Sequence, residues 1–295
     1  MNIFRKIIKN LNKNGLKRFV HFCVRKNFKI FEKYLAIHIT PAHFYSPIPQ
    51  TNELNPDVYK KVYDCIGIDW NLDKQLDNLS RMFPKYYEEY VPASNSGLSL
   101  VDAFVLYAMV REKKPNVMIE IGAGETTKIT LQALRKNKLE GKPCKFYSIE
   151  PYPGDELRKI QDENFELIDR KLQDVQIDLL STADLLFIDS SHVSKIDSDV
   201  NYEILEIIPT LKVGSLIHWH DIVMPTNYWK DWVNNGNMFW NESYMVHAFM
   251  LFNTSFKIVW AARYMQLNNF EKMHQLFPYF KQDHRLMSFW IERVG

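Results

Sequence analysis

The sequence contains few cysteines, few glycines and no long apolar run. Its three cysteines, Cys23, Cys65 and Cys144, are far apart and form no C-x-x-C pair, which excludes a disulfide framework and a cysteine zinc site. The longest apolar run covers only residues 103–110, whereas a membrane-spanning helix needs roughly 18 apolar residues. Lysines and arginines interrupt every apolar cluster near the start, so no secretory signal is expected. We therefore expect a reduced, cytoplasmic protein.

Acidic residues are scarce in residues 1–35, which carry ten lysines and arginines but one glutamate. This basic arm has a net charge of +9, and the remainder of the chain has −7, giving +2 in total. Its apolar residues predict two short amphipathic helices separated by a break at 12–15. Such helices can lie at the periphery of an anionic membrane, or they can pack on the rest of the chain. Nucleic-acid binding is disfavoured because the remainder is acidic. The apolar positions are Phe4, Ile7, Ile8 and Leu11 before the break, and Leu16, Phe19, Val20 and Cys23 after it.

Beyond the arm, the pattern divides into two further parts. Residues 36–95 begin with a proline-rich connection and continue as a helical cap over 57–90. Residues 96–295 open with a helix from Ser99, capped with Asp102, to Lys113. They then alternate short apolar strands with helical patterns, which predicts an α/β fold with a doubly wound, mostly parallel, seven-stranded sheet. The predicted strands are 117–121, 145–149, 165–168, 184–188, 215–219, 256–261 and 287–294, and the predicted helices between or after them are 127–137, 154–161, 175–180, 199–211 and 242–253.

Two of the ten glycines, Gly122 and Gly124, follow the first predicted strand. Glycines make up about half of their usual ~7%, so this Gly-x-Gly turn is not a compositional accident. A turn of this kind brings bare backbone close to a ligand at the carboxyl edge of a parallel sheet. A dinucleotide fingerprint would have a third glycine where Thr127 stands, which disfavours a nicotinamide cofactor.

The second and third predicted strands also end in polar residues. Glu150 follows the second strand and is placed to accept hydrogen bonds from a ribose diol. After the third strand, Gln173 and Asp174 can contact an adenine amino group, or Asp174 can simply cap a helix.

The fourth and fifth predicted strands end in acid and imidazole side chains. Asp189 and His192 follow the fourth strand, and His220 and Asp221 follow the fifth. Adjacent parallel strands place these four groups around one crevice, where such folds bind ligands. His218 shares a strand face with His220 and can support the site or belong to the core.

On these residues the chain resembles the class I S-adenosylmethionine-dependent methyltransferases, which have a Rossmann-like fold. Glu120-x-Gly122-x-Gly124 is similar to their first motif, and Glu150 to the ribose-binding acid of their second. The resemblance, over about 95–261, implies S-adenosylmethionine as cofactor, with Glu120 near its amino group. The cofactor-binding residues it implies are Glu120, Gly122, Ala123, Gly124, Thr126, Glu150, Gln173 and Asp174.

The chain also resembles metal-dependent sugar O-methyltransferases of the macrocin type and the cephalosporin-hydroxylase-like proteins. This resemblance implies His192 as the base and Asp189 and Asp221 as catalytic residues, with Asp189, His220 and Asp221 holding a divalent metal, Mg or Mn. His220 stands where that group has an acid, and this softer ligand favours manganese or leaves the site without metal. Two further segments, 43–47 and 240–244, resemble parts of bacterial methyltransferases, and Tyr45, Trp240 and Glu242 can cover a sugar there or, for Trp240, pack against a helix.

We therefore expect an O-methyltransferase acting on a hydroxyl of a sugar or glycan intermediate. The acceptor would be a small molecule or glycan, with no nucleic acid as partner and with homo-oligomerisation left open. Two alternatives remain: a nicotinamide-dependent oxidoreductase or epimerase on a similar sheet, and a non-catalytic methyltransferase-like scaffold tethered by the arm.

Overall fold

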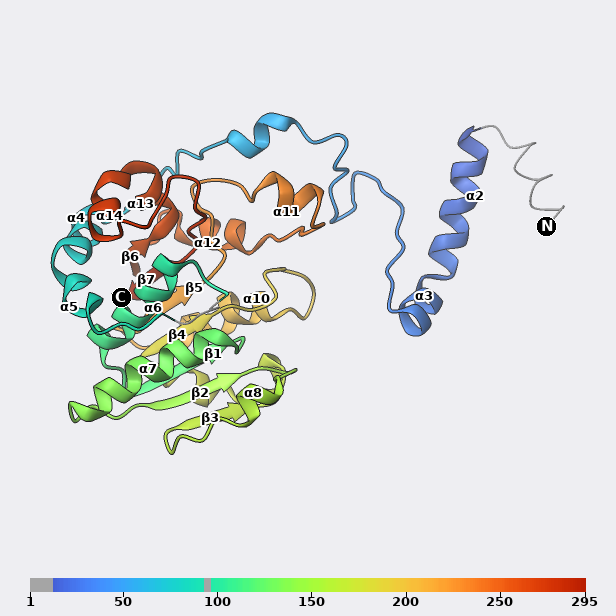
Figure 1. Cartoon of the computed structure of the whole chain (residues 1–295). Coiled ribbons are helices and arrows are strands. Elements are labelled where there is room, and N and C mark those ends of the chain that lie inside the picture. The colour runs from blue at the N-terminus through green and yellow to red at the C-terminus, as the bar shows by residue number, and fades with distance from the viewer. Residues whose placement is uncertain (1–12, 93–96) are drawn as a thin grey trace. The chain divides into compact units, whose positions relative to one another are not determined.

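The computed structural model describes residues 13–92 and 97–295 of the chain (Figure 1). The chain divides into two compact units. We call Met1–Val58 with Lys230–Phe239 the arm unit, and Tyr59–Trp229 with Trp240–Gly295 the sheet unit. Residues 59–92, predicted as part of a helical cap, therefore belong to the same unit as the sheet.

The described part of the arm unit contains helices, but its residues 36–55 are turns and irregular backbone. Helix α2 spans Lys13–Lys26 and α3 spans Phe28–Leu35, and α11, Lys230–Asn234, comes from the later segment. The predicted break at 12–15 is wrong for residues 13–15, which already belong to α2. The first predicted amphipathic helix, at 4–11, lies outside the described residues. No helix in the described ranges is both long and apolar enough to cross a membrane.

The sheet unit contains one seven-stranded sheet in the order β3-β2-β1-β4-β5-β7-β6. Strands β1 to β5 are parallel, whereas β7 runs antiparallel to both β5 and β6. The predicted mostly parallel, doubly wound α/β fold is confirmed. The strands are β1 Val117–Ile121, β2 Lys145–Ile149, β3 Phe165–Ile168, β4 Leu185–Ile188, β5 Leu216–Trp219, β6 Phe256–Ala261 and β7 Phe289–Arg293.

Alternate residues of each strand enter two separate apolar cores, because side chains point to opposite faces of a sheet. Met118 and Phe187 pack on one face against α6 and α7, which run side by side in Figure 1. Ile119 and Ile188 pack on the other face, with α10 and α12. The helices of this unit are α4 Leu72–Asp77, α5 Pro84–Tyr87, α6 Leu100–Lys113, α7 Glu125–Leu139, α8 Asp155–Arg158, α9 Ile177–Leu180, α10 Asp199–Tyr202, α12 Glu242–Met250, α13 Ala262–Asn268 and α14 Phe270–Leu276.

The capping prediction for α6 is confirmed, and the same residues tie two ends of the sheet unit together. Ser99 Oγ accepts a hydrogen bond from the Asp102 backbone N–H at 3.0 Å. The buried Asp102 carboxylate also accepts from the Met287 N–H and from the Ser288 hydroxyl, just before β7. The cap therefore fixes the start of α6 against the last strand of the sheet.

Several predicted helices are shorter in the structure. The segment predicted as one helix over 199–211 contains α10, a π-helical turn over Glu203–Ile207 and a short 3₁₀ turn over Ile208–Thr210. Pro209 has no backbone N–H to donate, which limits regular helix there. The helix predicted at 154–161 is the single turn α8, and that at 175–180 is reduced to α9.

Candidate active site

The turn after β1 contains two glycines, and only one of them, Gly122, cannot be replaced by a residue with a side chain. Gly122 has φ +80°, and a Cβ placed on it would lie 1.9 Å from the backbone oxygen of Asp189. Gly124 has an extended backbone, and a Cβ there would meet no atom within 4 Å. Only Gly122 is therefore required by close packing between β1 and β4.

Glu120 lies buried beneath this turn, where three hydroxyl groups donate to its carboxylate. The donors are Thr126 at 2.7 Å, Thr127 at 2.6 Å and Ser148 at 2.5 Å. Burial raises the pKa of Glu120 to about 7, against the opposing effect of these hydrogen bonds. Thr127 also accepts from the Gly124 N–H, so it braces the turn where a dinucleotide fingerprint would have glycine.

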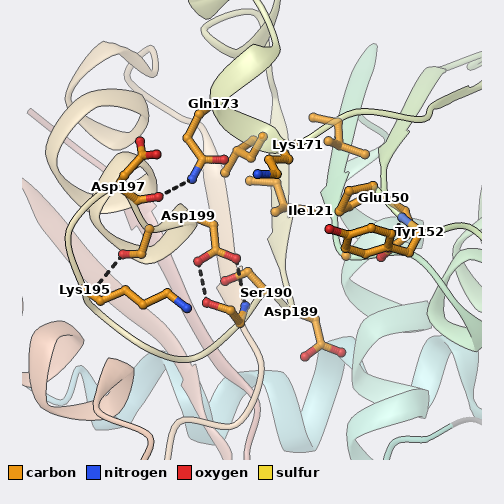
Figure 2. Close-up of a pocket in the computed structure, with 16 residues that line it drawn as sticks. Ile121, Glu150, Tyr152, Lys171, Gln173, Asp189, Ser190, Lys195, Asp197 and Asp199 are labelled. Carbon is orange, nitrogen blue, oxygen red and sulfur yellow. Dashed lines mark hydrogen bonds between the residues drawn. The ribbon is translucent and has the colours of Figure 1, made fainter. Parts of the chain in front are cut away.

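A cavity of about 450 Å³ opens above the carboxyl ends of β1 to β4 (Figure 2). This volume falls in the ~300–1,000 Å³ range of small-molecule sites. Glu150 and Tyr152 lie on one side of the cavity, and Asp197 and Asp199 lie on the other. The lining consists of Ile121, Gly122, Ile149, Glu150, Pro151, Tyr152, Lys171, Leu172, Gln173, Asp189, Ser190, Ser191, Lys195, Asp197, Ser198 and Asp199.

The predicted cofactor residues divide into those that line this cavity and those that do not. Gly122, Glu150 and Gln173 line it. The Glu150 carboxylate accepts from the Ala123 N–H at 3.4 Å and from the Tyr152 N–H at 2.8 Å, which fixes its direction. Gln173 donates to the Asp197 carbonyl at 2.8 Å. The remaining predicted positions, Glu120, Ala123, Gly124, Thr126 and Asp174, are not among the lining residues.

A carboxylate–imidazole cluster adjoins the cavity through Asp189. His192 Nε2 lies 3.3 Å from Asp189 Oδ1 and 3.2 Å from Asp221 Oδ2. His220 Nδ1 lies 3.4 Å from Asp221 Oδ1 and 3.8 Å from Asp189 Oδ1. The four residues expected around one crevice are therefore brought together, and Asp189 belongs to both the cavity and the cluster.

Two members of the cluster have a strained backbone. His192 has φ +60° and Asp221 has φ +56°, in the left-handed region that non-glycine residues seldom adopt. Such conformations cost of order 1–3 kcal/mol and are found preferentially at functional sites. The geometry of the cluster is thus maintained at an energetic cost to the fold.

The carboxylates stabilise the charged forms of both imidazoles. Burial alone would lower the pKa of His192, but Asp189, Glu242 and Asp221 raise it to about 10. Burial is likewise outweighed at His220, where Asp221 and Asp189 raise the pKa to about 9. The pKa of Asp189 is lowered, because its ion pairs with the histidines outweigh its burial. The carboxylates therefore favour the protonated form of both imidazoles.

Glu242, at the start of α12, orients His192 from the far side. Its Oε2 lies 2.8 Å from His192 Nδ1, and the Glu242 N–H donates to the His192 carbonyl at 3.2 Å. The Trp240 ring packs on the imidazole with centroids 4.4 Å apart. The sequence indicated Glu242 only as a sugar contact, because no local pattern relates it to a histidine fifty positions earlier in the chain.

His218 belongs to the core and not to the crevice. Its ring stacks on Phe187 at 4.3 Å and lies 4.4 Å from the Trp290 ring. Burial and the nearby His220 hold its pKa well below the usual value. The neutral ring therefore packs as an aromatic side chain beneath the cluster.

Residues 119–222, which include the turn, the cavity edge and the cluster, match the family model described as "Methyltransferase domain". An uncharacterized protein from Archaeoglobus fulgidus is 30% identical over 165 residues, covering 48% of this chain and 72% of that protein. The chain contains a methyltransferase domain. With its seven-stranded sheet, it is an enzyme of the class I methyltransferase type.

Solved structures similar to this methyltransferase are distant in sequence. The Podospora anserina methyltransferase PaMTH1, solved with SAH, is 15% identical with a TM-score of 0.44, covering 74% of this chain and 88% of that one. The O-methyltransferase TomG from Streptomyces achromogenes, solved with SAM, is 11% identical with a TM-score of 0.40, covering 74% and 90%. The assignment of a methyltransferase domain depends on the family model over residues 119–222.

Proposed function

We propose that the chain is an S-adenosylmethionine-dependent O-methyltransferase whose cofactor occupies the cavity above β1 to β4. One observation carries this proposal: Asp189 lines the cavity and also lies 3.3 Å from His192. A methyl donor in the cavity and a hydroxyl acceptor at the cluster would therefore both lie next to Asp189. Methyl transfer requires this proximity, because the acceptor oxygen must be aligned with the methyl group.

The cavity fits the cofactor by the chemistry of its lining. Gly122 supplies backbone without a side chain, and a carboxylate, Glu150, faces the space from the end of β2. Two backbone N–H groups already fix the Glu150 carboxylate, and its remaining lone pairs can accept from a ribose diol. When bound, S-adenosylmethionine would supply an electrophilic methyl group.

His192 is the proposed base for the acceptor hydroxyl. Glu242 holds Nδ1, so that Nε2 faces Asp189 and Asp221. These carboxylates keep the resting imidazole protonated, and the base role requires them to be engaged elsewhere during turnover. The proposed role of Asp189 and Asp221 is therefore to orient the acceptor hydroxyl, while Glu242 positions the imidazole that deprotonates it.

Asp189, His220 and Asp221 are proposed to hold a divalent cation. Their ligand atoms lie within 4.8 Å of one another. The buried Asp221 Oδ1 accepts no hydrogen bond among the described residues, and it lies 3.4 Å from Nδ1 of His220, the third proposed ligand. Two carboxylates and one imidazole suit Mn²⁺ better than Mg²⁺, which prefers oxygen ligands. A bound cation would lower the pKa of the acceptor hydroxyl.

The proposed acceptor is a hydroxyl of a sugar or glycan intermediate. The Trp240 ring beside His192 supports this, since aromatic rings present an apolar surface next to a polar site. Residues 13–35 are proposed to contact an anionic membrane surface. In support, α2 has no acidic residue in its first turn and ends with Arg25 and Lys26.

Thermal unfolding with added ligand tests the cofactor assignment. S-adenosylhomocysteine at 100 times its dissociation constant should stabilise the protein by about 2.7 kcal/mol, and NAD should have no effect. Stabilisation by NAD alone would instead support the oxidoreductase alternative. Methyl incorporation from labelled cofactor into nucleotide-sugar and lipid-linked sugar pools then tests catalysis, and binding without incorporation would support the scaffold alternative.

Sedimentation with vesicles tests the arm. The full chain should pellet with vesicles containing phosphatidylserine but not with phosphatidylcholine vesicles. Deletion of residues 1–35 should abolish the pelleting, and an unchanged bound fraction would contradict the membrane proposal.

A further inference from the structure

Two arginines of the sheet unit lie over the ring of one tryptophan. The guanidinium carbon of Arg285 is 4.8 Å from the centre of the Trp229 ring, and that of Arg263 is 5.7 Å from it. Arg263 belongs to α13, which follows β6, and Arg285 precedes β7. Three separate segments thus bring two positive charges to one aromatic side chain.

The electrostatics of Arg263 are unfavourable in the structure as it stands. Burial lowers the pKa of Arg263, and the positive charge of Arg285 lowers it further. Its Nε is buried and has no hydrogen-bond partner within residues 13–92 and 97–295, and its Nη1 donates to the neutral Gln266 side chain at 2.8 Å. No carboxylate is among the groups that shift this pKa. A partly buried cation of this kind is stabilised when an anion accepts its hydrogen bonds.

The sheet register places these arginines at the same edge as the cluster. Trp219 of β5 pairs with Phe289 of β7, which pairs with Ala261 of β6. Asp221 follows Trp219 by two residues at the end of β5, and Arg263 follows Ala261 by two residues at the end of β6. Strands β5 and β6 run in the same direction, so both residues lie at the same edge of the sheet. Neighbouring strands are about 4.8 Å apart, so the two positions are separated by a distance on the order of 10 Å.

Three sites therefore follow one another along the carboxyl edge of the sheet. The cavity spans β3 to β4, the carboxylate–imidazole cluster spans β4 and β5, and the arginines lie at β7 and β6. The arginines lie on the side of the cluster opposite the cavity. A single acceptor can reach both the cluster and the arginines if its reactive hydroxyl and its anionic group are separated by about one sugar ring.

We propose that Arg263 and Arg285 bind a phosphoryl group of the acceptor, so that the substrate is a phosphorylated or diphosphate-linked sugar. This inference depends on the proposed function, which places the reacting hydroxyl at His192. Two guanidinium groups match the charge of about −2 on a phosphate monoester or a diphosphate, and their N–H forks fit its oxygens. The Trp229 ring holds both guanidinium groups in place.

Anion binding by the full-length protein tests the inference without turnover. Titration calorimetry with inorganic pyrophosphate and with glucose 1-phosphate should show binding, and glucose should show none. Arg263→Gln and Arg285→Gln should each weaken pyrophosphate binding at least tenfold. Arg135→Gln is the matched control, because Arg135 is exposed and pairs with Asp162, and it should bind as the wild type does.

Two melting-temperature measurements distinguish an anion-binding role of the arginines from a purely structural one. Arg263→Gln should not lower the melting temperature without anion, because it removes a partly buried charge that lies near the positive charge of Arg285. Loss of a purely structural arginine would lower it. The melting-temperature increase produced by S-adenosylhomocysteine should persist in both variants. Equal pyrophosphate affinity in wild type and the double variant, or no binding to the wild type, overturns the phosphoryl site. Failure of S-adenosylhomocysteine to bind the wild type overturns the methyltransferase proposal separately.

Discussion

Gly122 and Asp189 are in backbone contact so close that no side chain fits between them. A Cβ on Gly122 would lie 1.9 Å from the Asp189 carbonyl oxygen, and the Asp189 N–H donates to the Ile121 carbonyl at 2.9 Å. The residue that shapes the turn after β1 therefore also sets the position of Asp189, which reaches both the cavity and the imidazole cluster.

Gly122→Ala should therefore be severely damaging. It combines a backbone clash with a positive φ, and we expect a loss of several kcal/mol of unfolding free energy or no folded protein. Gly124→Ala is the matched control, since its Cβ meets nothing within 4 Å, and it should retain the wild-type melting temperature within a few degrees. Thermal unfolding of both variants checks this, and equal stability would contradict the assigned contact.

Glu242→Gln should lower the methylation rate while leaving cofactor affinity unchanged. The carboxylate of Glu242 holds His192 Nδ1 at 2.8 Å and does not line the cavity, and loss of such an orienting charge commonly costs ten- to a hundredfold in activity. Glu206→Gln, on an exposed residue, is the control and should behave as wild type. Turnover and S-adenosylhomocysteine titration of both variants give the comparison; an unchanged rate in Glu242→Gln would remove Glu242 from the site.

A chelator that removes the proposed divalent cation should reduce turnover. Mn²⁺ titrated into metal-free protein should bind with one site per chain, and Asp221→Asn should weaken that binding at least tenfold, because it removes a charged ligand. His218→Gln is the comparison variant, since His218 packs between aromatic rings outside the three-residue cluster. A chelator that leaves the rate unchanged would exclude metal from the reaction.

The buried Glu120 should make stability fall as pH rises through the acidic range. Its pKa is raised from 4.5 to about 7 in the folded state, so the folded protein keeps a proton that the unfolded chain releases. The resulting loss of unfolding free energy is absent below pH ~4.5 and grows up to pH ~7. Above that pH it stays at ~3 kcal/mol. Glu120→Gln should remove this component. Unfolding free energies of both proteins between pH 4.5 and 8 test it, and an identical pH dependence would contradict the assigned pKa.

Arg111 should be the most costly ion-pair residue to remove. It is 4% exposed, pairs with Glu89 at 2.6 Å and with Glu140, and donates to Asn137. Arg111→Ala leaves Glu89 and the buried Asn137 side chain without this donor, while Glu140 keeps Lys114, and it should cost about 2–3 kcal/mol. Lys138→Ala, which breaks an exposed pair with Glu163, should cost far less, because solvent screens exposed ion pairs. Urea unfolding compares the two, and similar losses would contradict the role assigned to burial.

The sequence predicts the sheet well, because its strands are short apolar runs separated by turns. It also predicts that Asp189, His192, His220 and Asp221 meet, since parallel strands deliver their carboxyl ends to one edge. It cannot predict that Glu242 completes the cluster, because that contact depends on how a distant helix packs. The insertion of β7 between β5 and β6 is likewise decided by non-local pairing and not by local pattern.

The short helices and Glu120 show a different limit. Periodicity over 199–211 predicts one helix, but Pro209 and a π-helical turn interrupt the regular α-helical hydrogen bonds. Glu120 is predicted near the cofactor from motif resemblance, whereas its three hydroxyl donors depend on side-chain packing beneath the turn. Local pattern gives the position of a residue along a strand but not the partners that burial selects.

The sheet order also has a consequence for synthesis on the ribosome. Strand β6 is made before β7, yet within the described sheet it pairs only with β7. Until residues 289–293 emerge, the mostly apolar segment 256–261 has no neighbour to cover its backbone, and unpaired strands of this kind are prone to associate with other chains. The nascent protein therefore has a vulnerable interval in which a chaperone would protect it most.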